Sequence, residues 1–213
     1  EKVEQDSLAD YINKEGVEIL LVRSATTARK ELIDRCPGLK LIGRGGVGMD
    51  NIDVYYAREK GITVINTPAS SSQSVAELVM GQMYAISRFL HDAYKNVGQG
   101  DFNSLKKAYG KGVELRGKTL GILGFGRIGQ SLASYALGAG MDVIPITLTP
   151  DTFNVEVTIG SSQRVNVALE SVSDLSSALP KLDYLSIHVP KQDHGLAVIS
   201  HSEFNAMKKG IRI

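Results

Sequence analysis

The segment from Thr119 to Gly138 constrains the fold more than any other part of the sequence. A short apolar run, TLGIL at 119–123, leads directly into Gly124-Phe125-Gly126-Arg127-Ile128-Gly129, and a pattern of helical period covers 127–138. A strand, a glycine turn and a helix in this order are the opening half of a βαβ unit, whose helix crosses back over a parallel sheet. The segment therefore predicts an α/β fold built on a parallel sheet.

The rest of the chain repeats this alternation of short apolar, β-branched runs and stretches of helical length. We predict strands at 17–22, 39–42, 62–65, 119–123, 142–146 and 184–189, with another beginning at Ile211, and helices near 27–35, 53–60, 74–90, 127–138, 173–179 and 201–209. Capping boxes predict two helix starts, at Ser74 with Glu77 and at Ser200 with Glu203, and Gly210 has the place of a C-terminal cap.

Two α/β units meet near Asn66-Thr67-Pro68, where a long helical pattern begins and runs into the polar stretch 98–118. We therefore predict domains at 1–67 and 68–213. Alternating residues on both sides of Gly160-Ser161-Ser162 predict a β-hairpin insertion over 155–169. We expect it to be a surface decoration rather than a binding element.

Composition excludes several classes of protein. Of the 213 residues 43% are hydrophobic, and 24 Lys and Arg nearly cancel 23 Asp and Glu, so charge gives no reason to expect nucleic acid as a partner. No apolar run reaches the ~18–20 residues that span a bilayer, so no membrane partner is expected. A single cysteine, Cys36, excludes an internal disulfide and is compatible with a cytoplasmic location. The chain begins at Glu1 without a signal-peptide pattern, and we expect that a natural N-terminal segment precedes it.

The glycine turn at 124–129 has the composition of a dinucleotide-binding turn. Gly124 would allow the tight turn, Gly126 would let the backbone approach a pyrophosphate, and Gly129 would allow the helix to pack closely on the strand. The phosphates would lie at a helix N-terminus, where free N–H groups favour negative charge. A glycine turn that binds nothing is the alternative, and the flanking strand and helix disfavour it.

The residue after the next strand bears on the choice of cofactor. Dinucleotide sites usually have an acidic residue about 20 positions on, which accepts hydrogen bonds from the adenosine ribose. Here strand 142–146 is followed by Thr147, which offers only a hydroxyl. The missing carboxylate removes the usual repulsion of a 2′-phosphate, but 141–163 contains no Lys or Arg to attract one. We therefore expect NAD rather than NADP, with Asp151 as a substitute acid only if the loop is rearranged.

A second glycine cluster, Gly43-Arg44-Gly45-Gly46-Val47-Gly48, follows strand 39–42. Successive backbone amides at the carboxyl end of a strand can form an anion-binding concavity. Arg44 in this loop and Arg23 at the end of strand 17–22 would add two guanidiniums suited to a carboxylate or phosphate. Surface ion pairs are an equally simple explanation of two arginines, and their shared place at strand ends favours the ligand.

The histidines carry less information. His188 ends a predicted strand just before Val189-Pro190, where we expect a backbone contact to the cofactor rather than imidazole chemistry. His91 and His201 occupy polar surroundings typical of surface histidines. We find no metal-ligand spacing, no Ser-His-Asp arrangement, and no lysine after the glycine turn of the kind that binds nucleotide phosphates.

Together these residues resemble the D-isomer-specific 2-hydroxyacid dehydrogenases. The matching stretches cover nearly the whole chain and are 20–24 (LLVRS), 39–53 (LKLIGRGGVGMDNID), 61–68 (GITVINTP), 75–81 (VAELVMG), 115–129 (LRGKTLGILGFGRIG) and 188–190 (HVP). The resemblance implies two Rossmann- or flavodoxin-like parallel-sheet domains with a cleft between them, both apparently truncated in this chain. It also implies hydride transfer with NAD on a small anionic 2-hydroxy or 2-oxo acid, with 3-phospho-D-glycerate as the expected substrate. A glyoxylate or hydroxypyruvate reductase and a non-enzymatic NAD-sensing corepressor are the alternatives.

The resemblance also implies roles for individual residues. The substrate anion would be held by Arg23, Ser24, Arg44, Gly45, Gly46 and Val47, and the cofactor by Gly124, Gly126, Arg127, Ile128, Gly129, Thr147, His188, Val189 and Pro190. A homodimer would form through the nucleotide-binding domain, with an arm around 98–115 embracing the partner. The family's catalytic Arg, Glu and His would lie beyond Ile213, so this chain alone is expected to be inactive.

Overall fold

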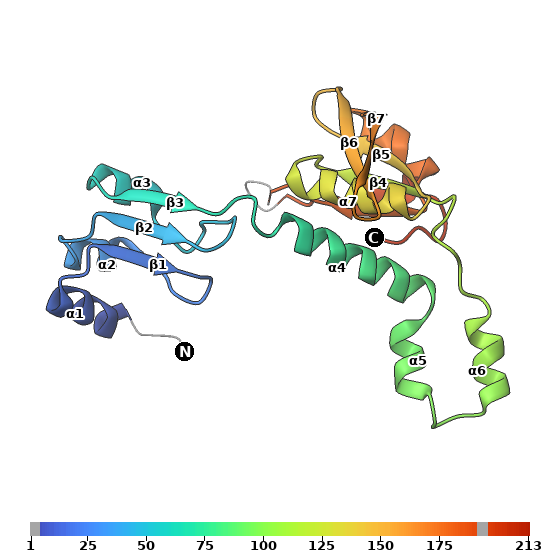
Figure 1. Cartoon of the computed structure of the whole chain (residues 1–213), viewed down its shortest axis with the longest axis horizontal. Coiled ribbons are helices and arrows are strands. Elements are labelled where there is room, and N and C mark those ends of the chain that lie inside the picture. Colours follow the sequence, from blue (N-terminus) through green and yellow to red (C-terminus); the bar gives the residue numbers. More distant parts are fainter. Residues whose placement is uncertain (1–4, 191–195) are drawn as a thin grey trace. The chain divides into compact units, whose positions relative to one another are not determined.

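A computed structural model describes residues 5–190 and 196–213, and the chain divides into two compact units, Glu1–Ser71 and Ser72–Ile213. Each unit has its own sheet and its own core (Figure 1). The division falls three residues after Pro68. No helix in the described residues is both long and apolar enough to cross a membrane.

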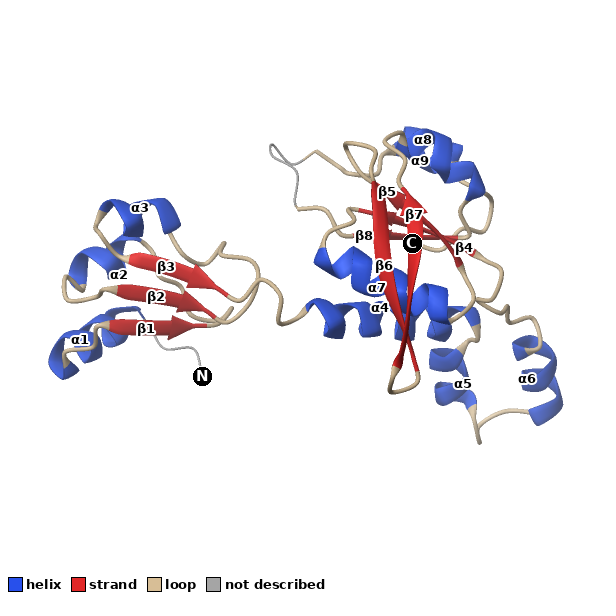
Figure 2. Ribbon diagram, turned by 45° about the horizontal axis from the view of Figure 1, so that its top comes forward, coloured by secondary structure: helices blue, strands red, loops and turns tan. Residues whose placement is uncertain are grey.

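The first unit contains a three-stranded parallel sheet in the order β1-β2-β3 (Figure 2). Its elements are α1 (Gln5–Glu15), β1 (Ile19–Val22), α2 (Lys30–Arg35), β2 (Leu41–Arg44), α3 (Val54–Glu59) and β3 (Thr63–Asn66). β2 begins and ends two residues later than predicted, because Gly43 and Arg44, which we expected to lie in a loop, pair with the neighbouring strands. Arg44 lies between Val22 and Asn66, so three strand ends meet at one edge.

Side chains along the strands of the first unit alternate between the two faces of the sheet, and those on one face form the core. Leu20, Val22 and Ile42 point to one face and are buried with residues of α1, α2 and α3. On the other face Leu21 and Ile65 are largely exposed.

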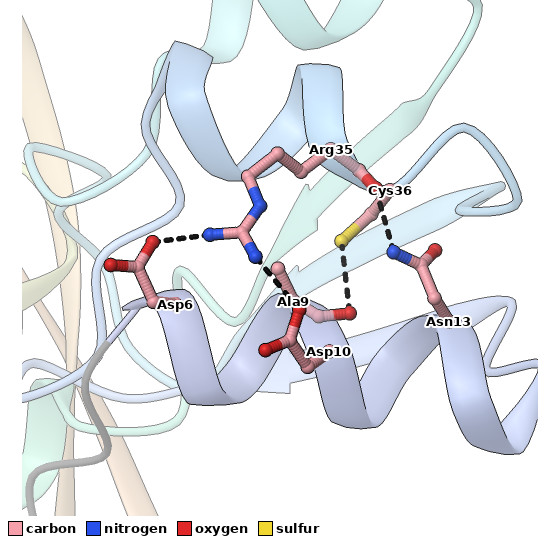
Figure 3. A network of polar contacts seen from close by, with 6 residues as sticks. All are labelled: Asp6, Ala9, Asp10, Asn13, Arg35 and Cys36. Atoms are coloured by element: carbon pink, nitrogen blue, oxygen red, sulfur yellow. Dashed lines mark hydrogen bonds and ion pairs between the residues drawn. The ribbon is translucent and has the colours of Figure 1, made fainter.

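Helix α1 was not predicted, and a polar network fixes it to α2 (Figure 3). The Arg35 guanidinium pairs with the carboxylates of Asp6 and Asp10, and the Asn13 side chain donates to the Arg35 carbonyl at 2.8 Å. Cys36 is fully buried beneath this network, and burial raises the pKa of its thiol. The thiol is therefore not activated for nucleophilic chemistry.

The second unit contains a parallel sheet in the order β5-β4-β8. Strands β4 (Thr119–Leu123) and β5 (Asp142–Ile146) and the intervening helix α7 (Arg127–Gly138) have the predicted bounds. β8 (Tyr184–Ile187) ends two residues before the predicted end, and Arg212 then pairs in parallel with Tyr184, as expected for a strand beginning near Ile211.

The predicted helix caps have different outcomes. The capping box of Ser200 and Glu203 is present at the start of α9 (His201–Ala206), which ends three residues earlier than predicted. Gly210 has a φ of 86° but lies in the turn after this helix rather than at its cap. The prediction at Ser74 is wrong, because α4 (Ser72–Ser87) already begins at Ser72.

The polar stretch 98–118 is more ordered than predicted. Phe89 adopts a left-handed conformation with φ 56° that ends the long helical pattern, and α5 (Leu90–Asn96) and α6 (Phe102–Tyr109) follow. Neither helix contains a buried residue.

The predicted hairpin is confirmed and extends further at its base, as β6 (Thr152–Ile159) and β7 (Gln163–Glu170) paired antiparallel. Val155 and Val157 are buried, and β6 packs along α7. The hairpin is therefore a cover for α7 and not only a decoration. A short helix, α8 (Leu175–Ala178), and a 3-10 turn, Leu179–Lys181, lead to β8.

Candidate functional site

The glycine turn between β4 and α7 needs glycine at two positions for reasons internal to the chain. Gly124 has a φ of 91°, and a Cβ there would lie 2.8 Å from the carbonyl carbon and oxygen of His188. A Cβ at Gly129 would lie 2.6 Å from the Gly124 carbonyl oxygen. These contacts explain the close packing of α7 on β4 and the tight turn before it.

Gly126 has no such internal reason to be glycine. A Cβ there would meet no atom within 4 Å, and its φ of −76° is open to any residue. The open space lies at the N-terminus of α7, whose first amides have no intrahelical acceptor. Exposed Arg127 lies beside them. A backbone cradle that a side chain would fill, next to free N–H groups, fits a phosphate-bearing cofactor.

Thr147 lies directly after β5 in a network of hydroxyl groups. Its Oγ1 donates to the Thr149 carbonyl at 2.8 Å and lies 2.9 Å from Oγ of Ser171, which in turn accepts from the Asp151 amide at 2.8 Å. The Asp151 carboxylate accepts from the Thr152 amide. Among the described residues, no carboxylate and no cationic side chain contacts Thr147. Ser171 lies 24 positions further along the chain, and the sequence alone did not indicate its contact with Thr147.

His188 lies just beyond β8, against the glycine turn. Its amide donates to the Leu123 carbonyl at 2.7 Å, and its Nε2 lies 2.8 Å from the Ser186 hydroxyl. Burial lowers the pKa of the imidazole, so the ring is neutral at pH 7. A Cβ at Gly124 would also meet Val189, at 2.9 Å, so the segment after β8 lies against the turn. Pro190 follows it and is exposed.

In the first unit, Arg44 is held in place by three hydrogen bonds. Nε donates to the Asn51 side chain at 3.2 Å, Nη1 to the Gly45 carbonyl at 3.0 Å, and Nη2 to the Ser24 hydroxyl at 3.1 Å. Across the described residues no carboxylate forms an ion pair with Arg44 or Arg23. The surface ion pairs considered as an alternative are therefore not formed here.

Asn51 is a site residue that the sequence did not single out. While its Oδ1 accepts from Arg44, its Nδ2 donates to the carbonyls of Arg23 and Thr26, at 3.0 and 2.6 Å. It thus joins the two arginine-bearing strand ends. The only signal in the sequence was its place in the MDNID run after the glycine cluster.

The predicted anion-binding concavity of backbone amides in the glycine cluster at 43–48 needs correction. The Gly45 amide donates to the Val22 carbonyl and the Gly46 amide to the Arg44 carbonyl, both at 2.9 Å. These two amides are engaged within the protein and do not face an anion. Gly46 instead makes room for Arg44, because a Cβ there would coincide with the guanidinium. Val47 is exposed, and its carbonyl accepts from the Asn66 side chain at 2.7 Å.

A cavity of about 270 Å³ opens at these strand ends. Its lining is mostly apolar and includes both arginines. The lining residues are Leu21, Val22, Arg23, Gly43, Arg44, Gly45, Ile65, Asn66 and Thr67. A mostly apolar lining with a few polar groups is typical of a small-molecule site.

Within the described ranges, no three His, Cys, Asp or Glu side chains cluster as metal ligands would. His188 and His91 contact a serine and a glutamine rather than a carboxylate. Neither of these two histidines contacts a described carboxylate that could assist it in proton transfer.

Comparison with known proteins identifies the family. The family model for the catalytic domain of D-isomer specific 2-hydroxyacid dehydrogenases matches residues 2–182. A hydroxypyruvate reductase of Thermotoga maritima is 40% identical over all of this chain and 64% of its own length. A D-3-phosphoglycerate dehydrogenase of Methanocaldococcus jannaschii is 38% identical over 90% of this chain and 34% of its own length. The chain thus spans less than two thirds of these relatives.

Solved structures agree with this assignment. A Polaromonas structure described as an NAD-binding D-isomer specific 2-hydroxyacid dehydrogenase is 26% identical, with a TM-score of 0.75 over 97% of this chain and 61% of that one. The D-mandelate dehydrogenase of Rhodotorula graminis, 22% identical, shares the fold with a TM-score of 0.80 over 99% of this chain and 63% of its own. These matches confirm the predicted α/β fold and NAD as a cofactor of the family. The chain belongs to the D-isomer-specific 2-hydroxyacid dehydrogenases.

Proposed function

We propose that this chain supplies the dinucleotide site and the substrate-anion site of an NAD-dependent D-2-hydroxyacid dehydrogenase that oxidises 3-phospho-D-glycerate to 3-phosphohydroxypyruvate, the first reaction of serine synthesis. The observation that carries the proposal is the pair Arg23 and Arg44, which end neighbouring strands without acidic partners among the described residues. Two guanidiniums at one strand edge suit a substrate with two anionic groups.

The two arginines would act differently. Arg44 uses three of its five N–H groups within the protein, which leaves one on each terminal nitrogen for an oxygen of the substrate. Arg23 is exposed, and no described residue bonds its guanidinium, so it is free to close on a second anionic group. The Ser24 hydroxyl already accepts a hydrogen bond from Arg44, so Ser24 would orient the Arg44 guanidinium rather than bind the substrate by itself.

The dinucleotide site would use residues of the second unit. Gly124, Gly126 and Gly129 would shape the turn, and Arg127 and Ile128 at the start of α7 would contact the pyrophosphate. Thr147, held by Ser171, would offer a hydroxyl to the adenosine ribose, and His188, Val189 and Pro190 would border the cofactor. When bound, NAD would supply the ring that accepts hydride from the hydroxyl-bearing carbon.

We propose that the 213-residue chain binds both ligands without turnover. Oxidation requires a base for the hydroxyl proton, and a histidine paired with a carboxylate is the usual one. His188 is neutral, but it is bonded to Ser186 and packed against the turn, where its role is structural.

Hydroxypyruvate reduction is the second candidate, supported by the Thermotoga maritima relative that matches the whole chain. Its smaller substrate has one anionic group and would need only one of the two arginines. The two candidates therefore differ in how much the second guanidinium contributes.

We also propose a homodimer formed through the nucleotide-binding domain, in which the arm around 98–115, which contains α6, embraces the partner together with the preceding α5. These helices bury no residue. The large apolar side chains of Tyr94, Val97 and Phe102, in or next to them, are at least 70% exposed. Two short helices without a core are marginal in water, so a second copy covering these side chains would stabilise the arm.

The test is ligand binding by calorimetry, with the purified chain. We expect NADH to bind more tightly than NADPH, and 3-phosphoglycerate more tightly than hydroxypyruvate. Arg44→Ala should weaken 3-phosphoglycerate binding about 10- to 100-fold, the range for a charge-assisted hydrogen bond. Arg58→Ala, an exposed arginine in the last turn of α3, is the matched control. Unchanged affinity in Arg44→Ala would refute the anion site, and tighter NADPH binding would refute the cofactor choice.

A further inference from the structure

The inner face of the β6–β7 hairpin packs along α7. Val157 lies 4.0 Å from the place of a Cβ at Gly138, in the last turn of the helix. In the middle, the Ser134 hydroxyl donates to the Glu156 carbonyl at 2.6 Å. Phe153 comes first on this face, and it lies beyond the start of the helix, against the glycine turn.

Phe153 contacts the turn through a single aromatic pair. Its ring lies 4.9 Å from the ring of Phe125, centroid to centroid, with the planes at 62°, an edge-to-face arrangement. Phe125 is the second residue of the glycine turn, and only 5% of it is exposed. Phe125 belongs to the buried core of the second unit, and Phe153, 28 positions further along the chain, adds a contact to its ring from outside the βαβ unit.

Hydrogen bonds also hold the backbone of the turn, among them the one from the Gln130 amide to the Gly126 carbonyl at 2.9 Å. The Gly124 amide donates to the Ile146 carbonyl at 3.0 Å, and the Gln130 side chain donates to the Phe125 carbonyl at 3.1 Å. Both act on the backbone on either side of Phe125. Glycines on each side leave this backbone freer than usual, so the Phe125 ring adds a side-chain anchor to the hydrogen bonds that orient the peptide after Phe125.

The base of the hairpin is fixed as well. Ser171, which follows β7, bonds Thr147 and both backbone groups of Asp151, so the two ends of the hairpin are tied at the carboxyl end of β5. The hairpin thus connects the end of β5 with the glycine turn. These are the two places where the proposed function puts the ribose and the pyrophosphate.

We propose that Phe153 is a positioning residue for the dinucleotide turn: by holding the Phe125 ring, it orients the Gly126 backbone toward the pyrophosphate. The proposal rests on the proposed cofactor site. It assigns the hairpin a role in binding, although no hairpin residue need touch the ligand.

The first test uses the ligand-free chain. Hydrogen exchange should be measured by NMR at the Gly124 amide and at the Gln130 amide, which donates to the Gly126 carbonyl at 2.9 Å. Phe153→Ala should raise exchange at both amides about three- to tenfold, the size expected for the loss of one aromatic pair. Phe153→Tyr keeps the ring and should restore the wild-type rates. Phe153→Leu keeps most of the volume without the ring and replaces Phe153→Ala if that variant fails to fold.

Val157→Ala is the matched control, because it removes buried side-chain atoms from the same face of the same strand at the other end of α7. It should lower thermal stability without changing exchange at the turn. The proposal is wrong if Val157→Ala raises exchange at Gly124 and Gln130 as much as Phe153→Ala does. It is also wrong if Phe153→Ala and Phe153→Leu leave the exchange at these two amides unchanged. In either case the hairpin is only a cover for the helix.

The second test compares ligands that contain or lack a pyrophosphate. Phe153→Ala should weaken binding of NADH and of adenosine diphosphate about three- to tenfold while leaving adenosine unchanged. Equal losses for adenosine and adenosine diphosphate would overturn the proposal. Absence of NADH binding in the wild-type chain would refute the proposed function instead, and the exchange rates of the ligand-free chain would still decide whether Phe153 positions the turn.

Discussion

Gly129 and Gly126 lie three residues apart in the same turn. Alanine at Gly129 should lower the stability of the fold, whereas alanine at Gly126 should weaken binding of NADH. At Gly129 a Cβ would lie 2.6 Å from the Gly124 carbonyl oxygen and 3.1 Å from Cγ2 of Ile122. The first distance is about 1 Å shorter than ordinary van der Waals contact, and the oxygen belongs to the backbone, so α7 must move away from β4. Such overpacking costs about 1–3 kcal/mol. For a unit of this size each kcal/mol lowers the unfolding midpoint by about 4 °C, so we expect Gly129→Ala to lower it by about 4–12 °C.

Gly126→Ala should leave stability within about 0.5 kcal/mol of the wild type, because its methyl group would meet no atom and the backbone conformation is allowed. The methyl group would instead occupy the space assigned to the pyrophosphate and weaken NADH binding at least tenfold. Thermal unfolding by circular dichroism and fluorescence titration with NADH, run on both variants, measure the two effects. A Gly129→Ala chain as stable as the wild type, or a Gly126→Ala chain with wild-type affinity, would refute the reasoning for that position.

Three further outcomes are expected. Asn51→Ala should weaken 3-phosphoglycerate binding about tenfold in calorimetry, because Arg44 loses the partner that orients it; equal affinity would mean that the other two bonds suffice. The Arg29 guanidinium holds the pKa of Asp53 below its ordinary 3.8, so this pair stabilises the fold above about pH 4, and its contribution is lost as the pH falls through the lower, folded-state pKa. Asp53→Asn should therefore be less stable than the wild type at pH 7, the difference should shrink as the pH falls below about 4, and a constant difference would contradict this. Tyr94→Lys should shift the sedimentation of the chain from dimer toward monomer, and an unchanged dimer would place the interface elsewhere.

The strands of the second unit could be predicted because their signals are local. The apolar run 119–123, the glycines after it and the helical period of 127–138 all agree, and the structure has these bounds. β2 was misplaced because Gly43 and Arg44 have low strand propensity and are paired only through neighbours on both sides. The end of α4 was misplaced for a similar reason, since nothing local marks Phe89 as a residue with positive φ.

The sequence could predict which positions belong to the site, but not which side chains contact one another there. Arg23, Arg44 and the glycine turn stand out because residue type and strand end coincide. Asn51, Ser171 and Phe153 act through partners 7 to 28 positions away, and no periodicity in the sequence points to these contacts. The Gly45 and Gly46 amides show the converse, because a motif that exposes amides in principle has them bonded to carbonyls here.

The separation of the two hydrophobic cores has a practical consequence. The buried cluster of the first unit runs from Ala9 to Val64, those of the second contain only residues from Ala76 onward, and no side chain belongs to both. We therefore expect a calorimetric melt of the chain to contain two cooperative transitions rather than one. A substitution such as Gly129→Ala displaces the transition of its own unit, and the other remains as a reference recorded in the same sample.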